Sequence, residues 1–300
     1  MAKIAVKFET AQGLSANQDA AAPLSGRLLA RRHGWTVRDV PCAAGPKDRP
    51  FEELHSCPGI AIVTAGTFQY RSSPGRELMT PGSLMLGNSG QFYECGHEHG
   101  TADRCISFSY DPKYFEGLAE EAGARIPHFS ALRVPPVREL SSVVARTCAA
   151  VDRAPDYSSG TAANEELWEE IAIELATRAL EFRDQSKTAP APPASEARVT
   201  KVVRMIEDHP TARHNLIELA LEVRLSRYHF IRIFQELTSL TPHQYVLRAR
   251  LRHAGAQLLR TPDRVLDIAL DCGFNDISNF NHAFLAEFGT SPRAYRLVAR

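Results

Sequence analysis

Two stretches decide the fold of the C-terminal part of this 300-residue chain: LALEVRLSRYHFIRIFQELTSLTPHQY at 219–245 and IALDCGFNDISNFNHAFLAEFGTSPRAY at 268–295. Ala220 matches Ala269 at an offset of 49, and after one inserted residue four further identities follow at an offset of 50. They pair Phe230 with Phe280, Phe234 with Phe284, Pro242 with Pro292 and Tyr245 with Tyr295. The equal Pro–Tyr spacing indicates an internal duplication.

Each copy predicts a short helix, a tight turn and a second, amphipathic helix. Ser226 is expected to cap the second helix of the first copy. In the second copy Gly273 can adopt the left-handed conformation of a sharp turn, and Asn275 or Asp276 then caps the next helix. Thr241-Pro242 and Ser291-Pro292 each combine a cap with a proline at the first helical position, and the helix Pro242–Leu259 is expected to join the copies.

The two faces of each second helix differ in character. The expected core residues are Phe230, Phe234 and Leu237 in one copy and Phe280, Phe284 and Phe288 in the other. The residues expected to point outward are polar and varied: Arg227, Tyr228 and Arg232, then Ser278, Asn281 and His282. This is the helix-turn-helix design, in which the second helix enters the major groove of DNA.

Residues 200–300 resemble the DNA-binding domain of the AraC family of bacterial transcription regulators. The stretches SRYHFIRIFQELTSLTPHQYVLRARLRHAGAQLL and DIALDCGFNDISNFNHAFLAEFGTSPRAYR carry the likeness. The resemblance implies an all-α domain with two helix-turn-helix units that binds duplex DNA. The residues that it places toward DNA are Tyr228, Ile231 and Arg232 in the first unit, with Arg227 beside them, and Ser278, Asn281 and His282 in the second.

The chain departs from the family pattern at three positions. Arg224 and Ser239 stand where glycines are common, and His282 stands where arginine is usual. A neutral histidine makes weaker contacts with phosphates and guanine than an arginine fork does. The second unit is therefore expected to contribute less specificity than the first.

The N-terminal part has a different pattern. Short apolar runs such as GIAIV, FQYR, SLMLG and CISFSY alternate with SSPG and TPG turns between residues 35 and 110, which predicts a small antiparallel sheet or barrel. Helices are expected at about 136–183. The proline-rich stretch SKTAPAPPASEA at 186–197 is interpreted as a linker. The predicted organisation is mixed: domain 1–185, linker 186–197 and domain 198–300.

The stretch TPGSLMLGNSGQFYECGHEH, 80–99, resembles the cupin-type sensor domain that AraC-family regulators often carry. The likeness implies a barrel that binds an effector and adjoining helices that dimerise. The candidate dimer helices are 136–151 and 164–183. Their apolar faces could equally pack on the barrel, and the sequence leaves both arrangements open.

The segment ECGHEHGTADRC, 94–105, concentrates metal-binding residue types. If residues 93–99 form one strand, Cys95, His97 and His99 share a face, and Cys105 could return on a hairpin. Zinc, or another divalent transition metal, accepts such nitrogen and sulfur ligands. Asp103 also occupies the carboxylate place of the cupin ligand pattern. Two alternatives stay open: a redox pair of Cys95 and Cys105 with lowered pKa values, and a polar hairpin that binds nothing.

Charge and composition narrow the function classes. From Glu196 onward 15 Lys and Arg face 11 Asp and Glu, whereas the first 195 residues carry 20 against 24. Of the C-terminal basic residues only Lys201 is a lysine, and arginine suits contacts with phosphates and base edges. The chain has no apolar run of membrane-spanning length and no secretory signal, so we expect a cytoplasmic protein, associated with the nucleoid when bound to DNA.

The sequence thus predicts a transcription regulator, not an enzyme and with no catalytic residues, that senses a small molecule, a metal or redox state. Its expected partners are duplex DNA, an unidentified effector, a second copy of the chain bound through helices 136–183, and RNA polymerase. The alternative is a metal-dependent cupin enzyme with a DNA-binding tail. Such an enzyme needs a further histidine from a later strand, and none lies between His99 and His128.

Overall fold

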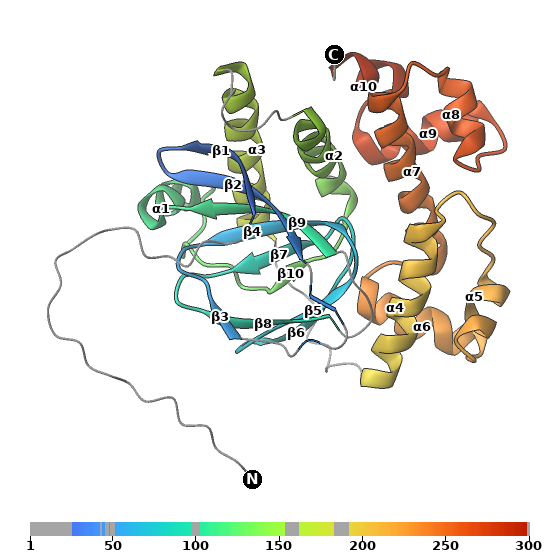
Figure 1. Ribbon diagram of the computed structural model, residues 1–300, viewed down its shortest axis with the longest axis horizontal. Helices are drawn as coiled ribbons and strands as arrows, with labels where there is room; N and C mark the ends of the chain where they lie inside the picture. Colours follow the sequence, from blue (N-terminus) through green and yellow to red (C-terminus); the bar gives the residue numbers. More distant parts are fainter. Residues whose placement is uncertain are drawn as a thin grey trace, which may run out of the picture.

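The computed structural model of the chain describes residues 26–42, 44–45, 48, 52–97, 103–153, 162–182 and 192–298. A β-rich N-terminal region is followed by helices, and the C-terminal region is helical throughout (Figure 1). The predicted order of an antiparallel sheet region and a helical region is confirmed at this level. Within the described residues no helix is long and apolar enough to cross a membrane.

Two antiparallel sheets form the N-terminal region. The first has the spatial order β1 (Arg27–Arg32), β2 (Trp35–Cys42), β9 (Asp103–Tyr110), β4 (Gly59–Ala65), β7 (Leu84–Gly87) and β10 (Arg133–Val134). The second has the order β3 (Glu52–Leu54), β8 (Phe92–Gly96), β5 (Phe68–Ser72) and β6 (Gly75–Met79). One apolar cluster joins the sheets, since it includes Val63 of the first and Tyr70 and Tyr93 of the second.

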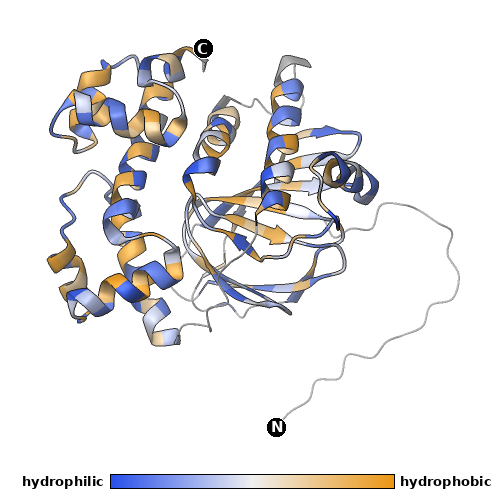
Figure 2. Ribbon diagram, turned by 180° about the vertical axis from the view of Figure 1, so that it is seen from behind, coloured by the Kyte–Doolittle hydropathy of each residue, from blue (hydrophilic) through white to orange (hydrophobic). Residues whose placement is uncertain are grey.

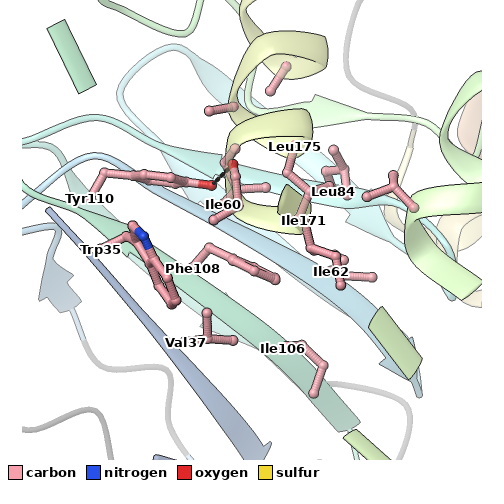
Figure 3. Packing of buried hydrophobic residues seen from close by; sticks show 14 of the residues in the cluster. Trp35, Val37, Ile60, Ile62, Leu84, Ile106, Phe108, Tyr110, Ile171 and Leu175 are labelled. Carbon is pink, nitrogen blue, oxygen red and sulfur yellow. Dashed lines mark hydrogen bonds between the residues drawn. The ribbon is translucent and has the colours of Figure 1, made fainter. Parts of the chain in front are cut away.

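Helices cover the other face of the six-stranded sheet. They are α1 (Pro112–Glu121), α2 (Arg138–Arg153) and α3 (Ala162–Glu181). Because side chains alternate along a strand, Phe108 and Tyr110 of β9 face these helices, where they join one core with Ile171 and Leu175 of α3 (Figure 3). The Tyr110 hydroxyl donates a hydrogen bond to the carbonyl of Ala172 at 2.8 Å. The apolar faces of α2 and α3 therefore pack on the sheet, which is the second of the two arrangements that the sequence left open.

The C-terminal region consists of α4 (Pro193–Asp208), α5 (Leu216–Glu222), α6 (Arg227–Thr238), α7 (Pro242–Arg260), α8 (Val265–Asp271), α9 (Ile277–Phe288) and α10 (Pro292–Val298). The long helix α7 joins two helical lobes, one around α5 and α6 and the other around α8 and α9 (Figure 1). Figure 2 shows that hydrophobic and hydrophilic residues alternate around these helices, as expected for amphipathic elements.

The predicted core faces and caps are confirmed. Phe230, Phe234, Phe280 and Phe284 are completely buried. The Ser226 side chain accepts a hydrogen bond from the backbone N–H of His229, and Asp276, rather than Asn275, caps α9. At the start of α7, Thr241 and Gln244 form a reciprocal capping box. Local hydrogen bonds thus start each second helix where the sequence pattern indicates.

The predicted linker differs from the structure at its C-terminal end. Residues 186–191 lie outside the described residues, but Pro193 to Ala197 belong to the first turns of α4, in which Ser195 and Glu196 are buried. Proline is tolerated in the first turn of a helix because the N–H that it lacks has no intrahelical partner there. The C-terminal end of the proline-rich stretch is therefore the start of helix α4.

Arg224 and Ser239, which stand where the family commonly has glycine, both adopt the left-handed backbone conformation. Arg224 has φ +54° in the turn between α5 and α6, and Gly273 has φ +81° at the equivalent place between α8 and α9. Ser239 (φ +63°) and Gly289 (φ +70°) form a second such pair, just after α6 and α9. Both copies therefore have the same backbone conformation at these two positions. Only the second copy has glycine there, which adopts this conformation without strain.

We expect Arg224→Gly to raise the free energy of unfolding by about 0.5–1 kcal/mol, because relief of the left-handed strain exceeds the greater chain entropy of glycine. Chemical denaturation of the two proteins measures the difference. Ser239→Gly should gain less, since the Ser239 hydroxyl accepts a hydrogen bond from Arg133 at 3.2 Å. A destabilised Arg224→Gly variant would contradict the strain argument.

Candidate nucleic-acid interface

The start of α6 presents the side chains that the sequence placed toward DNA. Arg227 and Tyr228 are exposed, Tyr228 to 81%. Arg232, one turn later, has a side chain 61% exposed and forms a loose pair with Glu236 at 3.8 Å. Ile231 is half-buried between them. This face offers two guanidinium groups and a phenol, all able to reach a partner without unfolding the helix.

The equivalent face of α9 is also exposed but carries no arginine. Ser278, Asn281 and His282 are all exposed. Asn281 and His282 line an open groove with Leu285 of the same helix, Leu266 of α8 and Arg293 of α10. An asparagine amide can read adenine, whereas an imidazole, as in His282, lacks the bidentate fork of an arginine. The two copies therefore expose equivalent positions with unequal chemistry.

Many of the C-terminal arginines have partners within the protein. The number of arginines by itself is therefore a weaker argument for nucleic-acid binding. Arg248 pairs with Glu287, and Arg252 pairs with Glu207. Arg250 donates to the carbonyls of Pro210, Ala212 and Gly273, and Arg296 donates to those of Leu258 and Asp263. Arg204 and Arg260 bind groups of the N-terminal region, Thr67 and Asp152. At the start of α6, Arg227 and Arg232 remain as exposed cations.

Arg250 also links the two copies. Its guanidinium, on the connecting helix α7, joins the loop that precedes α5 to the turn between α8 and α9 through the carbonyls of Ala212 (2.9 Å) and Gly273 (3.1 Å). Its own pKa is lowered by burial. A single half-buried side chain thus helps to hold the two exposed faces in one orientation.

The N-terminal region contacts the C-terminal region close to α9. Ser141 of α2 donates a hydrogen bond to Glu287 of α9 at 2.5 Å, and Arg248 of α7 donates to the carbonyl of Pro136. At the other end of α7, Arg260 binds Asp152 of α2 at 2.8 Å. Helix α2 therefore lies against the lobe that carries the second exposed face.

The geometry of the 94–105 segment differs from the predicted hairpin. Strand β8 ends at Gly96, so His97 does not continue it. Cys95 and Cys105 lie on different sheets and pack against the same interior cluster. His99 lies outside the described residues. The condition of one continuous strand over 93–99 is therefore not met, because β8 ends before His97.

The described residues of this segment do not fit a zinc site. Both ring nitrogens of His97 already have partners: Nδ1 lies 2.6 Å from a carboxylate oxygen of Asp103, and Nε2 lies 3.4 Å from the sulfur of Cys42. Nowhere in the described part of the chain do three or more His, Cys, Asp or Glu side chains form a group that could hold a metal. The metal prediction for Cys95, His97, His99 and Cys105 gains no support from the residues that the structure describes.

The two thiols are not activated. Burial raises the pKa of Cys95, and it raises that of Cys105 to about 12. Arg104, next to Cys105 in the chain, forms hydrogen bonds of 2.8 and 2.7 Å with Asp39. The raised pKa values disfavour the thiolate, which is the reactive form, and are opposite to the lowered values that the redox alternative assumed.

Asp103 connects the segment to the C-terminal region. Its buried carboxylate binds His97 through one oxygen, and its other oxygen accepts a hydrogen bond from the backbone N–H of Thr67 at 2.8 Å. The guanidinium of Arg204 in α4 lies 3.6 Å from that second oxygen and also binds Thr67 through its side chain and carbonyl. A Cβ atom at Gly66 would lie 1.8 Å from this carboxylate, so only glycine leaves room for it.

A second polar group lies between the sheets. His55 stacks on Tyr93 at 4.1 Å, and its Nε2 lies 2.8 Å from the hydroxyl of Tyr70. That hydroxyl donates to the carbonyl of Leu86 at 3.0 Å. Burial lowers the pKa of His55 from 6.5 to about 4, so the imidazole is neutral in the folded protein near neutral pH.

We expect this histidine to make stability depend on pH. Between about pH 6.5 and pH 4, His55 is protonated in the unfolded chain and neutral in the folded protein. The stability linked to neutral His55 is therefore complete above pH 6.5 and is lost as the pH falls toward 4, by about 3 kcal/mol. Denaturant unfolding at several pH values measures this slope, and His55→Phe should reduce it. His33→Phe, at an exposed position, should leave the slope unchanged. Equal slopes in all three proteins would exclude His55 as the cause.

Comparison with known proteins agrees with this geometry. A family model described as "Helix-turn-helix domain" matches residues 219–297. The regulator MtrA of Neisseria gonorrhoeae is 25% identical over 290 residues, which cover 86% of this chain and 92% of MtrA. The activator RhaS of Klebsiella pneumoniae (strain 342) is 35% identical over 102 residues, 34% of this chain and 37% of RhaS. The crystal structure of the DNA-binding domain of AdpA with a target DNA matches 34% of this chain and 93% of that chain, at 29% identity and a TM-score of 0.33.

The C-terminal region is thus a helix-turn-helix domain, a module that binds DNA. More specifically, it is an AraC-type helix-turn-helix domain, and the relatives MtrA and RhaS are AraC-family regulators. Both are named as transcription regulators rather than enzymes, in agreement with the expectation that this protein is not an enzyme.

Proposed function

We propose that the protein is a sequence-specific transcription regulator that reads duplex DNA with α6 and α9 and senses an effector through a cupin-like N-terminal domain. The observation that carries the proposal is that Tyr228 and Arg232, with the half-buried Ile231 between them, and the exposed Ser278, Asn281 and His282 lie at equivalent positions of two capped helices. Recognition helices read base edges from their N-terminal turns, which is where these residues lie.

The unequal chemistry assigns different tasks to the two units. Arg232 can make a bidentate contact with guanine, and Arg227 beside it can hold a phosphate. The second unit has the amide of Asn281 and the imidazole of His282, so it contributes fewer charged contacts. The first unit therefore dominates specificity, and the second extends the contact along the duplex.

Selection from a pool of random duplexes with the full chain tests the proposal. The expected result is enrichment of a common sequence whose affinity falls as salt rises, because binding releases counterions from the phosphates. Absence of an enriched sequence, or an affinity that does not depend on salt, would reject a sequence-specific regulator.

Substitutions of Arg232 and Arg227 test the proposed contact of each residue with DNA separately. We expect Arg232→Ala to weaken binding to the selected sequence by about 1–3 kcal/mol and to relax the preference at one base pair. Arg227→Ala should weaken all duplexes alike and reduce the salt slope by about one. Fluorescence anisotropy with selected and scrambled duplexes separates the two effects. Arg125→Ala, at an exposed position of the N-terminal region, is the matched control and should change neither.

A further inference from the structure

A cavity of about 660 Å³, including its open mouth, lies between the two regions of the chain. One wall is helix α2, and the others are α7, α9 and α10. The space open to the centres of water-sized molecules is about 100 Å³, and the larger figure includes open solvent, so the cavity suits a compact ligand. The side chains that form its apolar part are Val144, Ala145 and Cys148 on the α2 side and Leu259, Phe288 and Tyr295 on the other.

The charges around this cavity are compensated. Arg248 pairs with Glu287 at 3.4 Å, and Arg260 pairs with Asp152 at 2.8 Å. The Cys148 thiol is neutral, since burial raises its pKa to about 11. A charged ligand would therefore compete with ion pairs already formed, whereas an apolar ligand would leave these pairs intact and pack on the apolar side chains of the lining. The chemistry of the walls selects a compact, mainly apolar and uncharged molecule.

The position of the cavity adds a consequence for DNA binding. Helix α9 carries Asn281 and His282 on its exposed face and contributes Phe288 to the cavity. Helix α2 touches the same helix through the hydrogen bond between Ser141 and Glu287. A molecule bound between α2 and α9 therefore contacts both regions at once, and its affinity depends on how far apart they lie. A ligand that favours one spacing shifts the balance between arrangements of the two regions.

We propose that this interdomain cavity is the effector site and that its ligand is a compact, uncharged and mainly apolar molecule. The inference rests on the proposed function, because α9, which borders the cavity, is the second of the two helices proposed to read DNA. It locates the sensing in the contact between the regions and not in the 94–105 segment.

Binding of a neutral dye to the full chain tests the site. N-phenyl-1-naphthylamine is the probe, and the anionic 8-anilinonaphthalene-1-sulfonate is its charged counterpart. Saturable fluorescence with the neutral dye, bound at least as tightly as the anionic one, is expected. Ala145→Phe on α2 and Ala256→Phe on α7 fill the cavity from opposite walls, and each should weaken the neutral dye by about tenfold or more. Ala194→Phe, at an exposed alanine in α4, should bind the dye as the parent does.

Two further measurements use the unsubstituted protein. The first tests whether the dye occupies the cavity, and the second tests whether dye binding changes DNA binding. Mass spectrometry after N-ethylmaleimide treatment should show that the dye slows alkylation of Cys148 but not that of Cys57, in the unmodified sequence. Saturation with the neutral dye should change the affinity for the selected duplex by about fivefold or more, the usual size of coupling between two sites. Undiminished dye binding in both phenylalanine variants, unprotected Cys148 or an unchanged DNA affinity would each overturn the effector site. Loss of all specific DNA binding without dye would instead reject the proposed function, while dye binding would still report on the cavity.

Discussion

Replacing Phe284 by alanine is expected to lower the free energy of unfolding by about 3–5 kcal/mol, the cost of emptying a fully buried aromatic position. Phe284 is completely buried, and its ring lies 4.4 Å from that of Phe288, 5.4 Å from that of Phe280 and 5.3 Å from that of Tyr295. These rings join α9 to α10 and hold the second helix pair against α7. The cavity left by the substitution would have aromatic walls on three sides that cannot collapse together.

The neighbouring Leu285 provides the control. Its side chain is 52% exposed, so Leu285→Ala should change stability by about 0.5 kcal/mol or less. Denaturant unfolding of both variants measures the difference, and DNA binding measures its consequence. The Phe284→Ala protein should lose the contribution of the second reading helix while the first lobe, with its own core around Phe230 and Phe234, keeps its fold. A cost equal to that of Leu285→Ala would mean that this aromatic cluster does not hold the lobe together.

The second large effect is expected at Asp103. Asp103→Ala should cost about 3–5 kcal/mol, because it removes a buried carboxylate on which several donors converge and leaves the others without their partner. Those donors are the imidazole of His97, the backbone N–H of Thr67 and the guanidinium of Arg204. Asp103→Asn keeps the shape and one acceptor oxygen, so it should cost less. Asp271→Ala, at an exposed aspartate, serves as the control for loss of a carboxylate.

A double-mutant cycle with Arg204→Met separates the link between the regions from the local contacts of Asp103. If the carboxylate holds α4 against the sheets, the two substitutions should be non-additive by about 1 kcal/mol or more. Additive costs would show that Asp103 stabilises only its own region. The same variants, assayed with the selected duplex, measure whether this contact also affects DNA affinity.

The sequence predicted the local features of the C-terminal domain well. The duplicated phenylalanines are core, Ser226 and Asp276 begin the second helices, and Gly273 takes the left-handed turn. These features depend on residues a few positions apart, whose helical spacing and cap chemistry are written in the chain itself. The exposed residues of α6 and α9 could be named for the same reason, since a helix that buries one face exposes the other.

The structure of the segment 94–105 could not be predicted from the spacing of its cysteines and histidines. Its interpretation depended on whether β8 continues to His99 and pairs with the strand of Cys105. The structure ends β8 at Gly96 and places Cys105 in the other sheet, on β9. Strand pairing has no local signal, so a ligand pattern that assumed it gains no support from the described strands.

The amino-acid sequence by itself determined the helix pairs, their caps, their buried and exposed faces and the division into a β-rich and a helical region, because each follows from local periodicity. Only the tertiary structure decided which arginines remain available to a partner, since Arg204, Arg248, Arg250 and Arg260 find acceptors far away in the chain. It also decided that α2 and α3 pack on the sheet and that a cavity forms among α2, α7, α9 and α10. Burial and ion pairing depend on which distant surfaces meet, and that choice is made by the packing of the whole chain.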